Sequence, residues 1–151
     1  MLAAVGDTPY NIFLFIHIVT AAIGFAPVFV VPLLGRRGDG PGAGAALMDF
    51  VAQRTLRIYG NAIVLSGLIG FGVAGLSDKV YRVRQPWLIA AVILWTAILG
   101  LLHSGVIPAE RAIANADGRD EAAEQRLHRF GTAITVLFCV QIYLMVFKPG
   151  L

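Results

Sequence analysis

Long apolar stretches alternate with short charged segments along the chain, and the pattern occurs four times. The uncharged stretches hold 28, 20, 25 and 18 residues, and about 20 apolar residues in a helix cross a hydrocarbon layer of roughly 30 Å. None of the stretches alternates apolar and polar residues as a β-barrel strand does. The pattern predicts an all-α integral membrane four-helix bundle with spans at about 10–34, 57–77, 86–108 and 128–147.

Lys and Arg residues set the expected orientation of this bundle. The first and third loops contain Arg36, Arg37, Arg54, Arg57, Arg111, Arg119, Arg126 and Arg129, and the other segments outside the spans contain Lys79, Arg82, Arg84 and Lys148. Loops rich in Lys and Arg stay on the cytoplasmic side of a membrane. We therefore expect an up-down-up-down topology with both termini outside. Near the outer boundary this topology puts a belt of aromatic residues, which are Tyr10, Tyr81, Trp87 and Tyr143.

Composition narrows the class of protein. The chain is 58% hydrophobic and 14% charged, whereas a soluble domain is roughly 45–50% apolar and about 25% charged. The net charge of +3 comes from few charged residues, so a basic nucleic-acid-binding surface is disfavoured, and the apolar content excludes disorder. At 151 residues, the chain is expected to form a single transmembrane domain over 1–151.

Small residues form a stripe along the second span at a spacing of four, and they are Ala62, Ser66, Gly70 and Ala74. In lipid, such residues allow two helix backbones to approach closely, because van der Waals contact replaces the hydrophobic drive there. We interpret the stripe as a helix seam within this bundle. The alternative is that this face docks a second copy of the chain or another membrane subunit.

Sequence signatures of catalysis are absent from the chain. The single cysteine, Cys139, can form neither an internal disulfide nor a thiolate metal cluster, and we interpret it as a packed small hydrophobe. Glycine-rich phosphate loops, HExxH helices and GxSxG elbows are missing. The cores of the predicted spans also contain no Asp, Glu, Lys or Arg, which argues against an ion-coupled transporter. The sequence thus leans away from an enzyme and offers no catalytic residue.

Two polar residues fall inside the spans at matching depth. His17 is seven residues past Tyr10, and Gln141 is seven residues before Lys148. At a rise of 1.5 Å per residue, both lie roughly 10 Å below the outer boundary. Polar groups within a bilayer form hydrogen bonds between helices or contact a ligand. We expect a hydrogen bond between His17 and Gln141 across the first and fourth helices, or contact of both with a ligand or cofactor.

The other two histidines lie nearer the cytoplasmic side. His103 is expected in the inner leaflet, where it is a third candidate for cofactor contact, and His128 at the cytoplasmic interface. A haem held by two histidines needs both at one depth, but His103 and His128 differ by roughly 12 Å along their helices. The spacing therefore disfavours a bis-histidine haem, while one histidine with another axial ligand stays open.

The first span, LFIHIVTAAIGFAPVFVVPLLGRR, resembles the opening helix of a family of small bacterial predicted integral membrane proteins of unknown function. His17, Gly24, Phe25, Pro27 and Pro32 carry this resemblance. More distantly, FIHIV resembles the first-helix histidine of the copper-resistance D proteins and of the HemJ-type protoporphyrinogen oxidases. The resemblance implies a bacterial inner (plasma) membrane protein with several spans, and it maps only His17 onto a cofactor-associated histidine.

Two hypotheses about function follow. The first is a non-catalytic accessory or small-ligand-binding subunit in contact with the lipid bilayer and with no nucleic acid. The alternative is a haem- or porphyrin-linked membrane redox protein, in which His17 contacts the cofactor and Gln141 or His103 assists. The sequence identifies no metal site, and it leaves the cofactor unknown, with haem as a candidate.

Overall fold

The computed structural model describes residues 5–34, 43–78, 80–82, 84–116 and 120–150, and its elements are helical. They are α1 (Thr8–Leu34), α2 (Ala43–Arg54), η1 (Thr55–Tyr59), α3 (Gly60–Gly75), α4 (Pro86–Leu101), η2 (Leu102–Val106), α5 (Ile107–Asn115) and α6 (Glu121–Phe147). The π-helical turns η1 and η2 join α2 to α3 and α4 to α5, so the described chain forms four long rods. Arg36, Arg37, Lys79 and Arg119, which entered the predicted orientation, lie outside the described residues.

Each rod contains a helix that is long and apolar enough to cross a membrane, as the sequence predicts. The candidate spans are Thr8–Pro27, Asp49–Gly75, Pro86–Asn115 and Glu121–Phe147. Large apolar side chains such as Phe15 and Ile93 are 67% and 63% exposed, which is the surface that a lipid bilayer covers. The rod formed by α2, η1 and α3 begins before the predicted span of 57–77, and the rod formed by α4, η2 and α5 continues beyond the predicted span of 86–108. Hydropathy marks only the apolar part of each helix.

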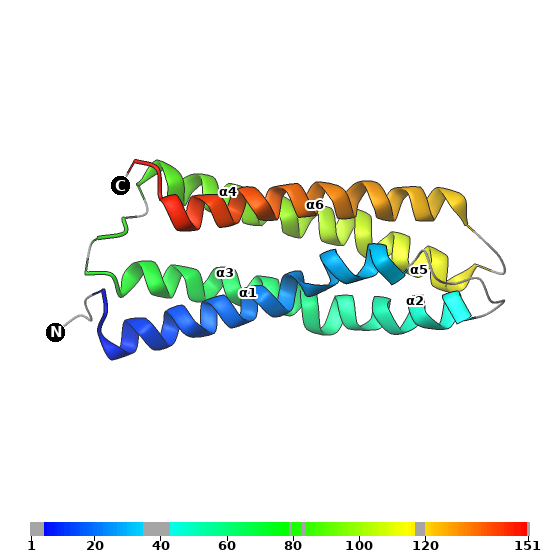
Figure 1. Cartoon of the computed structure of the whole chain (residues 1–151), viewed down its shortest axis with the longest axis horizontal. Helices are drawn as coiled ribbons and strands as arrows, with labels where there is room; N and C mark the ends of the chain where they lie inside the picture. Colours follow the sequence, from blue (N-terminus) through cyan, green and yellow to red (C-terminus); the bar gives the residue numbers. More distant parts are fainter. Residues whose placement is uncertain (1–4, 35–42, 79, 83, 117–119, 151) are drawn as a thin grey trace.

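The helices pack side by side as a bundle (Figure 1). α1 packs mainly on α3, α4 on α6, and α2 on α5. The start of α1 and the end of α6 lie at one end of the bundle, called here the terminal end, and α2 and α5 lie at the other (Figure 1). The Asp120 side chain accepts a hydrogen bond of 2.9 Å from the Ala123 N–H and so caps the start of α6.

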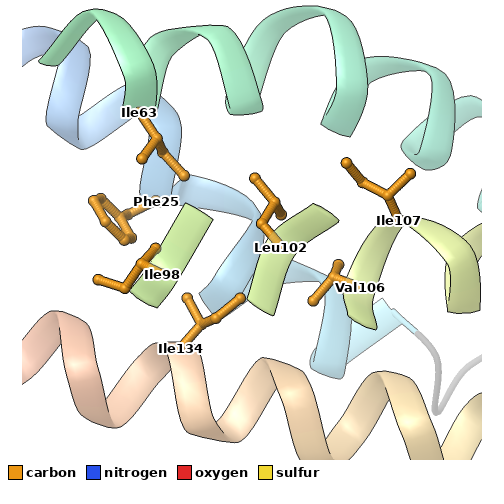
Figure 2. Close-up of a cluster of buried hydrophobic side chains, with 7 residues drawn as sticks. All are labelled: Phe25, Ile63, Ile98, Leu102, Val106, Ile107 and Ile134. Atoms are coloured by element: carbon orange, nitrogen blue, oxygen red, sulfur yellow. The ribbon is translucent and has the colours of Figure 1, made fainter. Parts of the chain in front are cut away.

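An apolar core joins the rods in the middle of the bundle (Figure 2). Its buried members are Phe25, Ile63, Ile98, Leu102, Val106, Ile107 and Ile134. Phe25 of α1 stacks on Phe138 of α6, with ring centroids 3.9 Å apart. These contacts tie the α1/α3 pair to the α4/α6 pair, and van der Waals packing is the main source of helix association in lipid.

The small-residue stripe lies inside the bundle. The Ser66 Oγ–H donates to the carbonyl oxygen of His17 at 3.3 Å, and a Cβ on Gly70 would lie 3.0 Å from the His17 ring. At the next contact along this seam, a Cβ on Gly24 would lie 2.6 Å from the Ile63 side chain. The contacts with α1 agree with the interpretation of the stripe as a seam. The same contacts leave little of this face for a second copy of the chain.

Gly105 brings η2 into close contact with α6, and it provides a test of the packing. A Cβ at this position would lie 2.3 Å from the Phe130 ring, so Gly105→Ala must displace the ring. Overpacking of this kind costs about 1–3 kcal/mol. We expect Gly105→Ala to lower the free energy of unfolding in detergent by that amount.

Gly100 supplies the matched control, because a Cβ there meets nothing within 4 Å. Gly100→Ala should leave the stability unchanged or raise it by up to about 1 kcal/mol, since alanine favours the helix. Phe130→Leu combined with Gly105→Ala should recover part of the loss. Equal stability of the two alanine variants would contradict the close contact between Gly105 and Phe130.

Candidate ligand cavity

A cavity of about 550 Å³ lies between the α1/α3 pair and the α4/α6 pair, in the half of the bundle nearer the terminal end. Small-molecule sites have volumes of about 300–1,000 Å³ and mostly apolar walls with a few polar groups. Phe25, Ile63 and Ile98 belong both to the cavity wall and to the central core. The core therefore closes the cavity towards the middle of the bundle.

Small residues leave this space open. Alanines and glycines of α1, α3 and α4 line the cavity where larger side chains would fill it, and they are Ala21, Ala22, Gly67, Gly70, Ala74 and Ala91. Aromatic rings form much of the remaining wall. Trp95 closes one side, because its Nε1–H donates to the carbonyl oxygen of Ile63 at 2.9 Å and its ring lies against Gly67.

His17 is held in one orientation at the side of the cavity. Its Nδ1 lies 2.8 Å from the carbonyl oxygen of Ser66. A carbonyl oxygen only accepts hydrogen bonds, so Nδ1 carries a proton and donates it. In the neutral ring this leaves Nε2 with a free lone pair, which binds a hydrogen-bond donor or a metal ion.

Gln141 lines the same cavity from α6. Its Oε1 is buried and has no hydrogen-bond partner within the described part of the chain. The structure thus brings His17 and Gln141 to one cavity, as their matching depth predicts. The hydrogen bond expected between them is not among those described, because the His17 ring turns to Ser66 of α3 instead. A buried acceptor without a partner costs about 1–3 kcal/mol, which a ligand with a hydroxyl or N–H group would remove.

A polar cluster of Tyr10, Tyr81 and Lys148 lines the cavity at the terminal end. The Lys148 Nζ lies 4.9 Å from the centroid of the Tyr81 ring. Lys148 beside the phenol lowers the pKa of Tyr81 below its usual value, and Tyr10 acts in the same direction against the effect of burial. The three side chains therefore form one electrostatically linked group, and this group favours negative charge.

Two of the aromatic residues of the predicted belt are buried in the bundle instead of lying on its surface. Tyr10 and Trp87 are 5% and 4% exposed and line the cavity, while Tyr143 is exposed. Tyr81 packs edge-on against Trp87 with ring centroids 5.6 Å apart. Sequence depth alone does not distinguish the two faces of a helix, and helix packing turns Tyr10 and Trp87 towards the cavity.

The remaining candidates lie away from the cavity. His103 of η2 is exposed, and its Nδ1 donates to the carbonyl oxygen of Leu99 at 2.9 Å within its own helix. His103 therefore does not contact a ligand bound beside His17. His128 is exposed in the first third of α6 and does not line the cavity. The interpretation of Cys139 as a packed residue is wrong, because this thiol is on the exposed face of α6.

Glu110 is a polar residue that the sequence analysis missed. It was placed beyond the third span, yet it is 1% exposed and its Oε1 accepts a hydrogen bond of 3.2 Å from the Thr55 hydroxyl of η1. Its Oε2 has no partner within the described residues. A signal was present, because Glu110 follows Val106 and Ile107 by four and three residues and therefore shares their buried helix face.

Metal ligands do not cluster in the described part of the chain, where groups of three or more His, Cys, Asp or Glu residues suited to a metal ion are absent. Comparison of the chain with protein-family models, with curated proteins and with solved structures found no match. The function is therefore inferred from the fold and the cavity.

Proposed function

We propose that this protein is a multi-pass protein of the bacterial plasma membrane, with both termini outside, that binds a small apolar molecule in the cavity. It acts as a binding or accessory subunit without catalytic residues of its own. In this orientation the cavity occupies the outer half of the bilayer. The resemblance of the first helix to small bacterial membrane proteins supports the choice of membrane.

The observation that carries the proposal is an apolar cavity with two polar atoms that have no hydrogen-bond partner among the described residues. The cavity of about 550 Å³ has the size of a small-molecule site. Gln141 Oε1 is buried without a donor in the described chain, and His17 has Nε2 left over once Nδ1 bonds to Ser66. A ligand that donates a hydrogen bond satisfies either atom while its apolar body fills the space.

Tryptophan fluorescence tests for an occupant directly, because the two tryptophans of the chain, Trp87 and Trp95, both line the cavity. A brominated molecule that enters the cavity contacts both rings and quenches them. We expect the methyl ester of dibromostearic acid to give saturable quenching of the protein in lipid nanodiscs. Ala91→Phe, which fills part of the cavity, should weaken this binding by about tenfold or more.

Ala97→Phe is the matched control, because Ala97 is on the exposed face of α4 and should leave the quenching curve unchanged. Ala21→Phe makes the same test from α1 if Ala91→Phe fails to fold. Non-saturable quenching that is equal in the wild type and in the filled variants reflects contact through the lipid, and that result would overturn the proposal.

A haem or porphyrin is the second candidate for the occupant, and the partner of His17 favours it. Histidines that ligate metals usually donate their other ring N–H to a carbonyl or carboxylate oxygen, as His17 does to Ser66. The apolar, aromatic walls fit a flat macrocycle, which His17 of α1 would hold while Gln141 lines the cavity from α6. Haem would supply one-electron redox chemistry, and the chain would orient it and exclude water.

A further inference from the structure

The terminal end of the cavity has the chemistry of an anion-binding site. Of the described residues that line the cavity, Lys148 is the one cation and none is a carboxylate. Tyr10 and Tyr81 add two phenol groups beside it, and Lys148 draws the pKa of Tyr81 downward. Among the described residues, the wall around a bound molecule therefore carries one positive charge and no carboxylate to neutralise it.

The position of Lys148 differs from that of an ordinary interfacial lysine. Lysines at membrane boundaries extend their amines towards water or lipid headgroups. The side chain of Lys148 instead lies over the Tyr81 ring and lines the cavity. Its ammonium is thus available to a ligand that enters the bundle.

The polar groups lie in order along the cavity. Lys148 and Tyr81 are at the terminal end, and Gln141 and His17 follow roughly 10 Å deeper, at a rise of 1.5 Å for each of seven residues. Beyond them the wall ends at Phe25, Ile63 and Ile98 of the core. A ligand that matches this order has an anionic head, an apolar body and a hydrogen-bond donor partway along it.

We propose that the cavity binds an amphiphile with a single carboxylate, whose head lies at Lys148, Tyr81 and Tyr10 and whose apolar body extends towards Phe25. This inference rests on the proposed function and names the class of its ligand. A single lysine with neighbouring phenols matches a monoanion, whereas a doubly charged phosphate needs more cations for neutralisation. Charge-assisted hydrogen bonds from Lys148 and the phenols hold the head.

Paired probes test the inference. Dibromostearic acid and its methyl ester differ only in the charge of the head, and both quench Trp87 and Trp95 on entering the cavity. In nanodiscs of neutral lipid, we expect the acid to bind the wild type about tenfold more tightly than the ester or better. Lys148→Met should remove this preference by weakening the acid alone, and Lys148→Arg should keep it.

Arg82→Met is the control for general surface charge, since Arg82 is in the connection at the same end and does not line the cavity. It should leave the preference for the acid intact. Equal affinities of acid and ester in the wild type, or an unchanged preference in Lys148→Met, would overturn the carboxylate site while leaving the cavity as a binding site. Saturable quenching by neither probe would instead overturn the proposed function itself.

Discussion

Replacement of His17 by asparagine is expected to abolish the haem binding that the second candidate function requires, while leaving the bundle folded. The amide of the new side chain would still donate to the carbonyl oxygen of Ser66, which Nδ1 of His17 now does at 2.8 Å. The asparagine side chain has no group at the position that Nε2 of His17 occupies. If Nε2 would hold the haem, its loss costs several kcal/mol and hence more than a hundredfold in affinity, at about 1.4 kcal/mol for each factor of ten.

The measurement is a haem titration of the detergent-purified protein, followed by the Soret band. His128→Asn is the matched control, because His128 is exposed at the start of α6 and should leave the titration unchanged. Unfolding curves of both variants separate a lost ligand from a lost fold. A wild-type protein that gives no Soret band after haem addition would remove the haem candidate, and the apolar-ligand proposal would then rest on the bromine quenching.

Replacement of Glu110 by lysine is expected to give the largest loss of stability. Glu110 is 1% exposed, and the described residues around it offer a single hydrogen bond from Thr55. A lysine ammonium there would be a buried charge facing a hydroxyl, and an uncompensated buried charge costs about 3–5 kcal/mol. Glu110→Gln, by contrast, keeps the shape and an acceptor for the Thr55 hydroxyl, so we expect a change within about 1 kcal/mol.

A mixed-micelle titration measures the free energy of unfolding of both variants. Glu121→Lys makes the same change at an exposed site in the first turn of α6 and should cost less than about 1 kcal/mol. Thr55→Val should cost about 1–3 kcal/mol, since it leaves the carboxyl without its donor. A Glu110→Gln variant as unstable as Glu110→Lys would show that Glu110 is held as a paired charge.

The number of helices that are long and apolar enough to cross a membrane, and their approximate positions, were predictable from the sequence. These features depend on local properties, because hydropathy over about 20 residues decides whether a helix suits the hydrocarbon layer. The matching depths of His17 and Gln141 were also predictable, because the helical rise converts a residue count into a distance. Both residues indeed line one cavity.

The partners of these residues depend on how the helices pack. The rotation of each helix about its axis turns His17 towards Ser66, turns Tyr10 and Trp87 inward, and leaves Cys139 exposed. When a helix is apolar on every face, its hydrophobic pattern does not show which face points into the bundle. Van der Waals packing between the helices determines this rotation.

The order of residues along the chain was therefore enough to establish four candidate membrane spans and the depth of their polar residues. Three features came from the packed bundle instead: small residues of separate helices meet to leave a cavity, Lys148 faces into it, and Glu110 is buried against Thr55. A cavity and a buried contact are properties of the space between helices, and that space exists only once the helices have packed.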